Sequence, residues 1–223
     1  MRIVDGDGMP RPPPSSRPYA GYSQGETALA VDDPRYEFPD PPPPLMPIPA
    51  MKCFDMRGAR VIIGGPGRGW RVDLRADDPL MRGGRLLVPV LSESDYYRSE
   101  DEGTEAMAAL HPVESVWVEQ PDESAQRRTA PPHLFERLVD VEAPPVRLPV
   151  PASDVHGLTG RRVWHWVDGA FATDLRCVSE AFENSDGDIA VMLAPEREWY
   201  RWARTGKPPT VEEALIHLTW LEN

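Results

Sequence analysis

The chain has no excess of positive charge and no long apolar run, and each of these absences argues against a class of protein. Lysine occurs only at Lys52 and Lys207 among 223 residues, and the net charge is −12 with a pI near 4.9. Binding to nucleic acid by neutralising phosphates needs clustered Lys and Arg, so we expect no such partner. No apolar run approaches the roughly twenty residues that cross a bilayer, so we expect no membrane partner.

Cysteine is also scarce, because Cys53 and Cys177 are the only two and lie far apart. No charged segment followed by an apolar one opens the sequence as a secretory signal would. The default for such a chain is a cytoplasmic protein with reduced thiols, although the sequence alone leaves open a bond between the two cysteines.

Catalytic signatures are missing as well. The sequence has no GxSxG elbow, and its five histidines show no HxH or HxxxH spacing and lie near no cysteine pair. We therefore expect no cofactor and no metal, and name no catalytic residue. His165 follows the inward alternation of Val163 and Val167, which predicts a hydrogen-bonded histidine within a core.

Proline, in contrast, is abundant and unevenly placed. Thirteen of the 27 prolines lie in the first 49 residues. Proline has no backbone N–H and favours polyproline II, so we interpret residues 1–44 as an extended arm. The remaining chain carries enough apolar residues for one or two modest cores.

An internal repeat of about eighty residues organises the rest of the chain. Shifting the sequence by about 102 positions aligns 47–61 with 149–163, including a Gly-x-Arg-Val motif in both. An Asp-Leu-Arg triplet at 73–75 then meets a second at 174–176, and further on Trp117 meets Trp220. We predict module copies at 45–119 and 144–223, joined by a linker over 120–143.

Each copy shows the period-two apolar alternation of short strands and one helical stretch. The alternation places Trp70, Val72 and Leu74 on the inward face of the second strand of copy one. It places their counterparts Phe171, Thr173 and Leu175 on the same face in copy two. "EREWYRWART" predicts a helix, and "TEAMAALH" a short additional one in copy one. The predicted fold class is α+β, a tandem duplication of a small, mainly antiparallel β module with one short helix, preceded by the extended Pro-rich arm.

Two segments resemble ligand loops but have simpler interpretations. "VIIGGPGRGW" lacks the GK[ST] ending of a phosphate loop and precedes a strand, and copy two carries the hairpin signal Asp168-Gly169 at the same place. "ENSDGDI" lacks the alternating acidic positions and closing Glu of a calcium loop, so we predict a polar turn.

The Asp-Leu-Arg triplets are the sharpest polar feature. With the leucine inward, Asp73, Arg75 and their counterparts should face the other side, near the Tyr-Arg pairs 97–98 and 200–201. They could grip a ligand carboxylate, or they could bond to one another and tie the helix to the sheet. We favour the structural alternative, since a shared fold explains features that both copies share.

The copies differ most in tryptophan. Trp164 and Trp166 make one strand apolar on both faces, so the protein itself or a partner must cover the second face. Trp199 and Trp202, three residues apart on a helix, share a face. The candidate binding residues are Trp164, Trp166, Trp199, Trp202, Asp174, Arg176, Tyr200 and Arg201.

Three hypotheses for function remain open. The first is a non-enzymatic binding or assembly protein that uses a protein partner or self-association, with the Pro-rich arm docking on a neighbour. The second is an acidic inhibitor, of the immunity type, that neutralises a basic partner. The third is an enzyme with a site between the two copies, using Asp174, Arg176, Glu196 or Tyr200; we expect no enzyme, because no acid and base pair can be recognised.

Overall fold

The structure is a computed structural model that describes residues 39–65, 69–122 and 143–222. Residues 1–38 of the predicted arm, most of the predicted linker and the tip of the glycine-rich loop lie outside the described residues. The chain divides into two compact units. The described residues between 43 and 148 form one unit, here the first module, and those between 149 and 222 belong to the other, here the second module.

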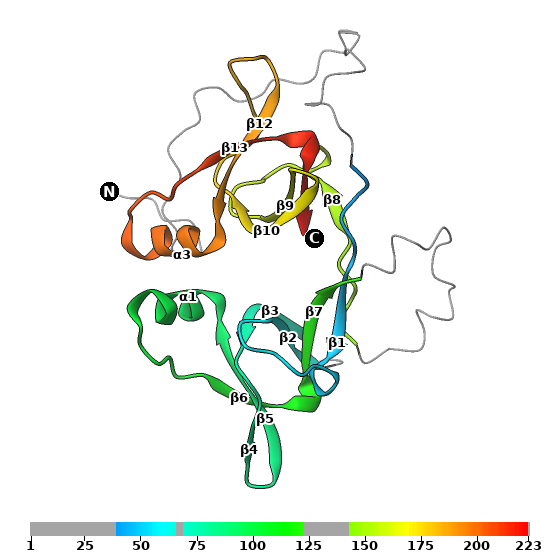
Figure 1. Cartoon of the computed structure of the whole chain (residues 1–223), viewed down its shortest axis with the longest axis vertical. Coiled ribbons are helices and arrows are strands. Elements are labelled where there is room, and N and C mark those ends of the chain that lie inside the picture. Colours follow the sequence, from blue (N-terminus) through cyan, green and yellow to red (C-terminus); the bar gives the residue numbers. More distant parts are fainter. Residues whose placement is uncertain (1–38, 66–68, 123–142, 223) are drawn as a thin grey trace, which may run out of the picture. The chain divides into compact units, whose positions relative to one another are not determined.

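The first module is a seven-stranded sheet with one α-helix (Figure 1). Its strands follow the order β1-β7-β2-β3-β5-β4, and β6 pairs with β5. Every described pairing is antiparallel. In chain order the elements are β1 (Leu45–Pro49), the 3-10 helix η2 (Ala50–Lys52), β2 (Arg60–Gly65), β3 (Gly69–Ala76), β4 (Leu80–Arg82), β5 (Arg85–Ser92), α1 (Glu93–Glu102), β6 (Ala109–Pro112), η3 (Val113–Ser115) and β7 (Val116–Pro121).

The second module repeats this plan element by element. Its sheet follows the order β11-β12-β10-β9-β14-β8, and β13 pairs with β12. The elements are β8 (Pro149–Pro151), η5 (Ala152–Asp154), β9 (Arg162–Val167), β10 (Ala170–Cys177), β11 (Phe182–Glu183), β12 (Ile189–Pro195), α3 (Glu196–Thr205), β13 (Glu212–Leu215), η6 (Ile216–Leu218) and β14 (Thr219–Glu222). The chain is therefore α+β, and its two antiparallel sheets have the same strand order.

Each module buries its own apolar core against one face of its sheet. In the first module Val61, Leu74 and Val118 are among the core residues, and their counterparts in the second module are Val163, Leu175 and Leu221. A β-branched or leucine side chain at each of these positions suits a pleated, half-buried surface. The shared apolar alternation thus specifies the same inward face twice.

A β-bulge breaks the alternation that we predicted for the second strand. Asp73 and Asp174 both have φ of 56°, and the register with the neighbouring strand shifts at each. Because a bulge inserts one extra residue, side chains before it change face. The prediction that Trp70 and Val72 share the inward face of Leu74 is wrong, and Val72 is 41% exposed.

The second module shows the same change of face. Phe171 pairs with Trp166 and packs against aromatic rings on the face opposite Leu175, so the prediction for Phe171 was also wrong. Thr173 is exposed.

Helix α3 spans the predicted "EREWYRWART", whereas "TEAMAALH" is not helical. Residues 104–108 form no regular element, and 109–112 are strand β6, paired with β5. Tertiary pairing along β5 overrides the local helical propensity of the alanines.

The predicted turns are confirmed where they are described. Asp168 and Gly169 form a two-residue hairpin with φ of 52° and 81°. In the "ENSDGDI" turn the Asn184 side chain accepts hydrogen bonds from the N–H groups of Asp186 and Asp188, at 3.0 and 2.9 Å. That geometry is a side-chain-stabilised turn.

Candidate functional site

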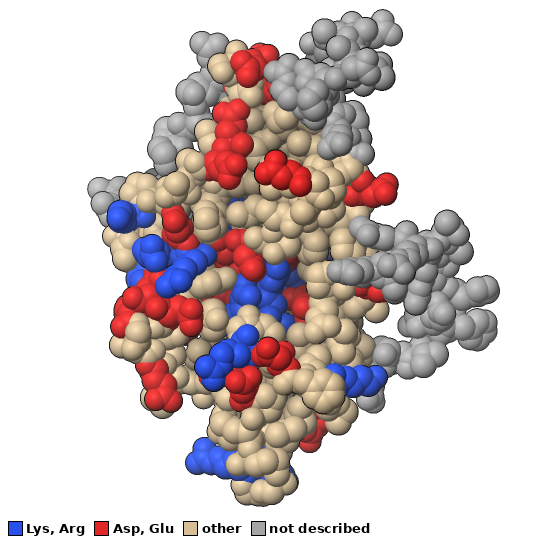
Figure 2. Space-filling view, in the orientation of Figure 1, with Lys and Arg blue, Asp and Glu red and all other residues tan. Residues whose placement is uncertain are grey.

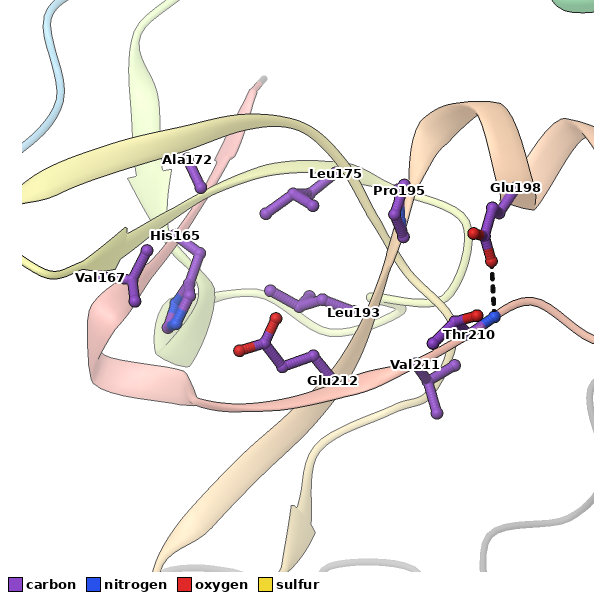
Figure 3. Close-up of a pocket in the computed structure, with 10 residues that line it drawn as sticks. All are labelled: His165, Val167, Ala172, Leu175, Leu193, Pro195, Glu198, Thr210, Val211 and Glu212. Carbon is purple, nitrogen blue, oxygen red and sulfur yellow. Dashed lines mark hydrogen bonds between the residues drawn. The ribbon is translucent and has the colours of Figure 1, made fainter.

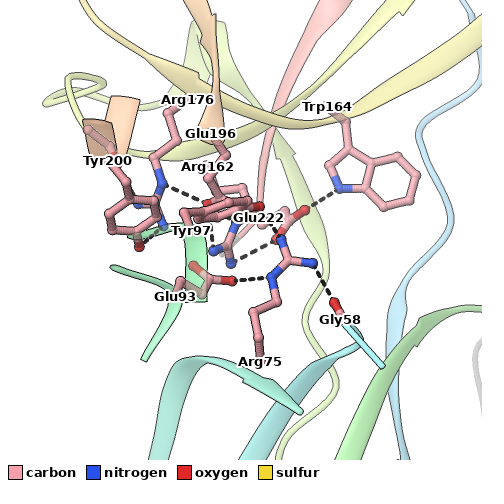
Figure 4. Close-up of polar contacts among 11 residues, drawn as sticks. Gly58, Arg75, Glu93, Tyr97, Arg162, Trp164, Arg176, Glu196, Tyr200 and Glu222 are labelled. Carbon is pink, nitrogen blue, oxygen red and sulfur yellow. Dashed lines mark hydrogen bonds and ion pairs between the residues drawn. The ribbon is translucent and has the colours of Figure 1, made fainter. Parts of the chain in front are cut away.

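The arginine of the first Asp-Leu-Arg triplet joins sheet to helix. Arg75 follows the bulge on β3 and is 7% exposed. Its Nε lies 3.3 Å from the Glu93 carboxylate, and its two terminal nitrogens donate to the Gly58 carbonyl (2.9 Å) and the Tyr97 hydroxyl (2.8 Å) (Figure 4). Its guanidinium also lies 6.0 Å from the centre of the Tyr96 ring.

The second module builds the same arrangement with counterpart residues. Arg176 donates to Glu196 (2.8 Å), to the Gly160 carbonyl (2.9 Å) and to the Tyr200 hydroxyl (2.9 Å) (Figure 4). Its guanidinium lies 4.8 Å from the centre of the Trp199 ring.

A second arginine extends this cluster. Arg162 on β9 donates to the same Glu196 oxygen from Nε (2.9 Å) and from a terminal nitrogen (2.7 Å), and lies 3.6 Å from Glu222. Glu222 in turn accepts a hydrogen bond of 2.7 Å from the Trp164 indole N–H. Glu196 is 1% exposed, so these charges are paired away from water. The contacts are those of the structural alternative, in which the triplet ties the helix to the sheet.

The two predicted tryptophan pairs lie in different surroundings. Trp164 is 3% exposed and Trp166 is half-buried; both meet the Phe171 ring edge to face, with centroids 5.8 and 4.9 Å apart. Trp220 also meets Phe171, at 5.4 Å. These four rings cover the face of the sheet opposite the core and bring Trp164 and Trp166 together.

The other predicted residues lie on α3 and at the bulge. Trp199 and Tyr200 contact each other and Arg176, whereas Trp202 and Arg201 are half-buried on the same helix. Asp174 is exposed in the bulge. The structure therefore brings Arg176, Trp199 and Tyr200 into one cluster.

Cys53 packs against the core of the first module, Cys177 lies in the core of the second, and His165 is buried. Neither thiol forms a disulfide. Burial raises the pKa of Cys53, and it raises the pKa of Cys177 to about 12 with a smaller effect from Glu180. A thiol with so high a pKa is a poor nucleophile. His165 is 9% exposed and hydrogen-bonded to Leu218, as predicted, although Val167 in the same alternation is 40% exposed.

Sequence reasoning missed the hairpins at which the modules differ. The β4–β5 hairpin projects from the first module and turns at Gly83 and Gly84, both with positive φ (Figure 1). Arg82 and Arg85 are direct cross-strand partners and are exposed. Beside them are three exposed apolar side chains: Leu80 (39%), Met81 (66%) and Leu86 (38%).

The counterpart hairpin of the second module has the opposite charge. Glu183 ends β11, and Asp186 and Asp188 lie in the turn before β12. In the same turn Asn184 donates to Glu213 of β13 at 2.7 Å. Figure 2 shows basic side chains at the tip of the β4–β5 hairpin and acidic ones over β12 and β13. Comparing "MRGGR" with "ENSDGDI" for charge could have found this difference.

Within 39–65, 69–122 and 143–222 no three His, Cys, Asp or Glu residues are grouped to hold a metal. No helix in the part of the chain that the structure describes is long and apolar enough to span a membrane. No protein-family model, curated protein or solved structure matches the chain.

Proposed function

We propose that this is a non-enzymatic assembly protein whose copies associate head to tail. The β4–β5 hairpin of one copy would bind the β11–β12 hairpin of the next. The observation that carries the proposal is the direct pairing of Arg82 with Arg85 at the exposed end of a hairpin. Like charges directly opposite each other destabilise a strand pair, and an acidic partner would remove that repulsion.

The apolar content of the hairpin supports a protein surface as the partner. Both faces of the hairpin are exposed, because Leu80 points to one face while Met81 and its cross-strand partner Leu86 occupy the other. A projecting cluster of exposed apolar side chains beside charges is typical of a protein interaction site.

A second copy of the chain offers the matching chemistry. Its β11–β12 hairpin combines three carboxylates with the half-buried Phe182 and Ile189. Strands β4 and β11 each pair with one described neighbour, so each presents a strand edge to which another strand can add. Because the two hairpins differ, such a contact is heterologous and continues into chains or closes into rings.

The test uses charge reversal at each hairpin. Variant one is Arg82→Glu with Arg85→Glu, and variant two is Asp186→Arg with Asp188→Arg. Sedimentation velocity at low salt should show association of the unmodified chain, because salt weakens attraction between surface charges and screens them beyond about 8 Å at physiological ionic strength. Each variant alone should be monomeric, whereas an equal mixture should associate through the unmodified hairpin of each.

The matched control is Lys52→Glu with Lys207→Glu, which has the same charge change as variant one at other exposed positions. It should associate as the unmodified chain does. A monomer at every concentration and salt, or a mixture of the two variants that stays monomeric while the control associates, would refute the proposal.

A second candidate function draws on the same acidic hairpin. An inhibitor that neutralises a basic partner would use Glu183, Asp186 and Asp188 in a monomeric chain. Association of the unmodified chain that variant one abolishes favours assembly. A monomer that binds polylysine and loses this binding in variant two favours the inhibitor.

A further inference from the structure

A pocket of about 270 Å³ opens in the second module, on the core side of its sheet (Figure 3). Leu175 and Leu193 form its apolar wall, joined by Val167 and by Val211 from the segment before β13. Arg176 follows Leu175 on β10 and therefore points to the opposite face of the sheet, where it contacts Glu196 and Tyr200. None of Asp174, Arg176, Glu196 or Tyr200 lines the pocket. None of the hairpin residues that carry the proposed contact between copies lines this pocket.

A buried histidine supplies a hydrogen-bond acceptor to this pocket. His165 Nδ1 lies 3.1 Å from the Leu218 carbonyl, which can only accept, so we assign the proton to Nδ1. The Thr219 hydroxyl, 3.3 Å away, donates to the Leu215 carbonyl instead. In this tautomer Nε2 carries a lone pair, and no partner for it is found among the described residues.

Burial keeps this ring neutral at physiological pH. Burial lowers the pKa of His165, and the nearby His217 adds to this effect; the bond to Leu218 and the charge of Glu212 oppose it. The net pKa lies below the usual value, so at neutral pH the imidazole is an acceptor at Nε2 and carries no charge.

A carboxylate stands beside the histidine. Figure 3 shows the Glu212 carboxylate directed toward the His165 ring. The other carboxylate at the rim, Glu198, is already engaged, because it accepts a hydrogen bond of 2.6 Å from the Thr210 N–H. The neighbouring Glu213 accepts a bond from Asn184 at the β11–β12 turn.

The first module has aliphatic residues at the equivalent positions. The cross-strand pair of His165 and Thr219 corresponds to Ile63 and Val116, and Glu212 corresponds to Ala109. The shared fold therefore does not require a polar group here, since an isoleucine that is 4% exposed fills the same place in the first module.

We propose that this pocket binds a small organic ammonium, with an apolar body against Leu175 and Leu193 and its N–H groups donated to His165 Nε2 and Glu212. An apolar wall with two convergent acceptors, one of them charged, matches a cationic donor and disfavours anions. Charge-assisted hydrogen bonds of this kind are the stronger ones, so the charged nitrogen should dominate selectivity.

The test is a titration of the full chain with benzylammonium, followed by calorimetry and by the imidazole resonances of His165. Benzyl alcohol and benzoate have the same apolar body and serve as controls. Benzylammonium should saturate and shift the His165 resonances, while benzyl alcohol binds more weakly and benzoate does not compete.

Two glutamate variants complete the experiment. Glu212→Gln should weaken benzylammonium binding by about tenfold, the usual effect of removing one charge-assisted hydrogen bond. Glu213→Gln, its neighbour in sequence with the side chain bonded elsewhere, should leave the affinity unchanged. Benzoate binding as tightly as benzylammonium, no saturable binding, or equal effects of the two variants would each overturn the proposal.

Discussion

At the scale of single residues, Glu196 holds the second module's helix on its sheet. One of its oxygens accepts hydrogen bonds from both Arg162 and Arg176, at 2.7 to 2.9 Å. All three residues are less than 9% exposed. Replacing both partners of such a group by apolar residues can be neutral, but removing one leaves buried charge without compensation.

The variant Glu196→Gln should therefore lower the free energy of unfolding by about 3 to 5 kcal/mol. The glutamine keeps an acceptor oxygen but not the charge that two guanidinium groups share. Urea unfolding followed by tryptophan fluorescence measures the change. The control Glu183→Gln, at an exposed position, should change the free energy of unfolding by no more than about 0.5 kcal/mol. An equally small effect at Glu196 would contradict its role in holding the helix on the sheet.

Glu180 gives a pH dependence with a defined sign. Partial burial raises its pKa, but hydrogen bonds from the Leu158 and Thr159 N–H groups (3.0 and 3.1 Å) and the Thr159 hydroxyl (2.8 Å) outweigh this and hold the pKa below 4.5. A carboxylate with a depressed folded pKa stabilises the fold above its unfolded pKa, and this contribution disappears as the pH falls through the folded value.

We therefore expect Glu180→Gln to destabilise the chain at neutral pH and the difference to shrink on acidification below pH 4.5. Denaturant unfolding at a series of pH values measures it. Glu114→Gln, exposed in the first module, is the comparison. A difference that stays constant or grows in acid would contradict the assigned hydrogen bonds.

At the scale of elements, the bulges in β3 and β10 explain why the apolar alternation predicted the inward face correctly after the bulge and wrongly before it. Leu74 and Leu175 point inward as predicted, because they follow the bulge in register with Val61 and Val163. Val72, before it, does not. The pattern of apolar residues does not reveal a bulge at an aspartate. Asp is, however, among the few residues that tolerate a positive φ, so its recurrence in both triplets was the sequence feature that could have predicted the bulge.

The bulge itself can be tested at Asp174. A β-branched residue at φ of 56° is strained, so Asp174→Val should destabilise the second module by about 1 to 2 kcal/mol, and Asp174→Gly by less. Thermal unfolding monitors both. The adjacent exposed Thr173→Val, which also adds an apolar β-branched side chain, should be near neutral, and equal losses at 173 and 174 would argue against backbone strain.

The sequence predicted one of the candidate sites and missed the others. The Arg176 and Tyr200 contacts were predicted as a structural alternative, because both copies carry the residues. The pocket and the hairpins were not predicted, since each depends on which residues from distant strands meet. Thr219 and Glu212 come close to His165 only through the pairing of β14 with β9 and the packing of β13.

At the scale of the whole molecule, the repeat was the part of the fold most readable from the sequence. Shifts of 102, 101 and 103 residues in the alignment correspond to the starts of β2 and β9, the Asp-Leu-Arg triplets and the two helices. The change from 101 to 103 falls in the loops around β4 and β11, where changes of length are tolerated. The same strand order in both sheets follows from the shared pattern of apolar residues.

Because each module has its own sheet and core, each should fold alone. The core of the second module is drawn entirely from residues between Ala152 and Leu221. We expect a fragment of residues 149–223 to give a dispersed amide spectrum and to unfold cooperatively, with modest stability because a chain of this size buries a smaller fraction of its surface. Glu196→Gln in the same fragment should lower its unfolding midpoint. A fragment without cooperative unfolding, restored by adding residues 43–148, would instead show that the second module depends on the first.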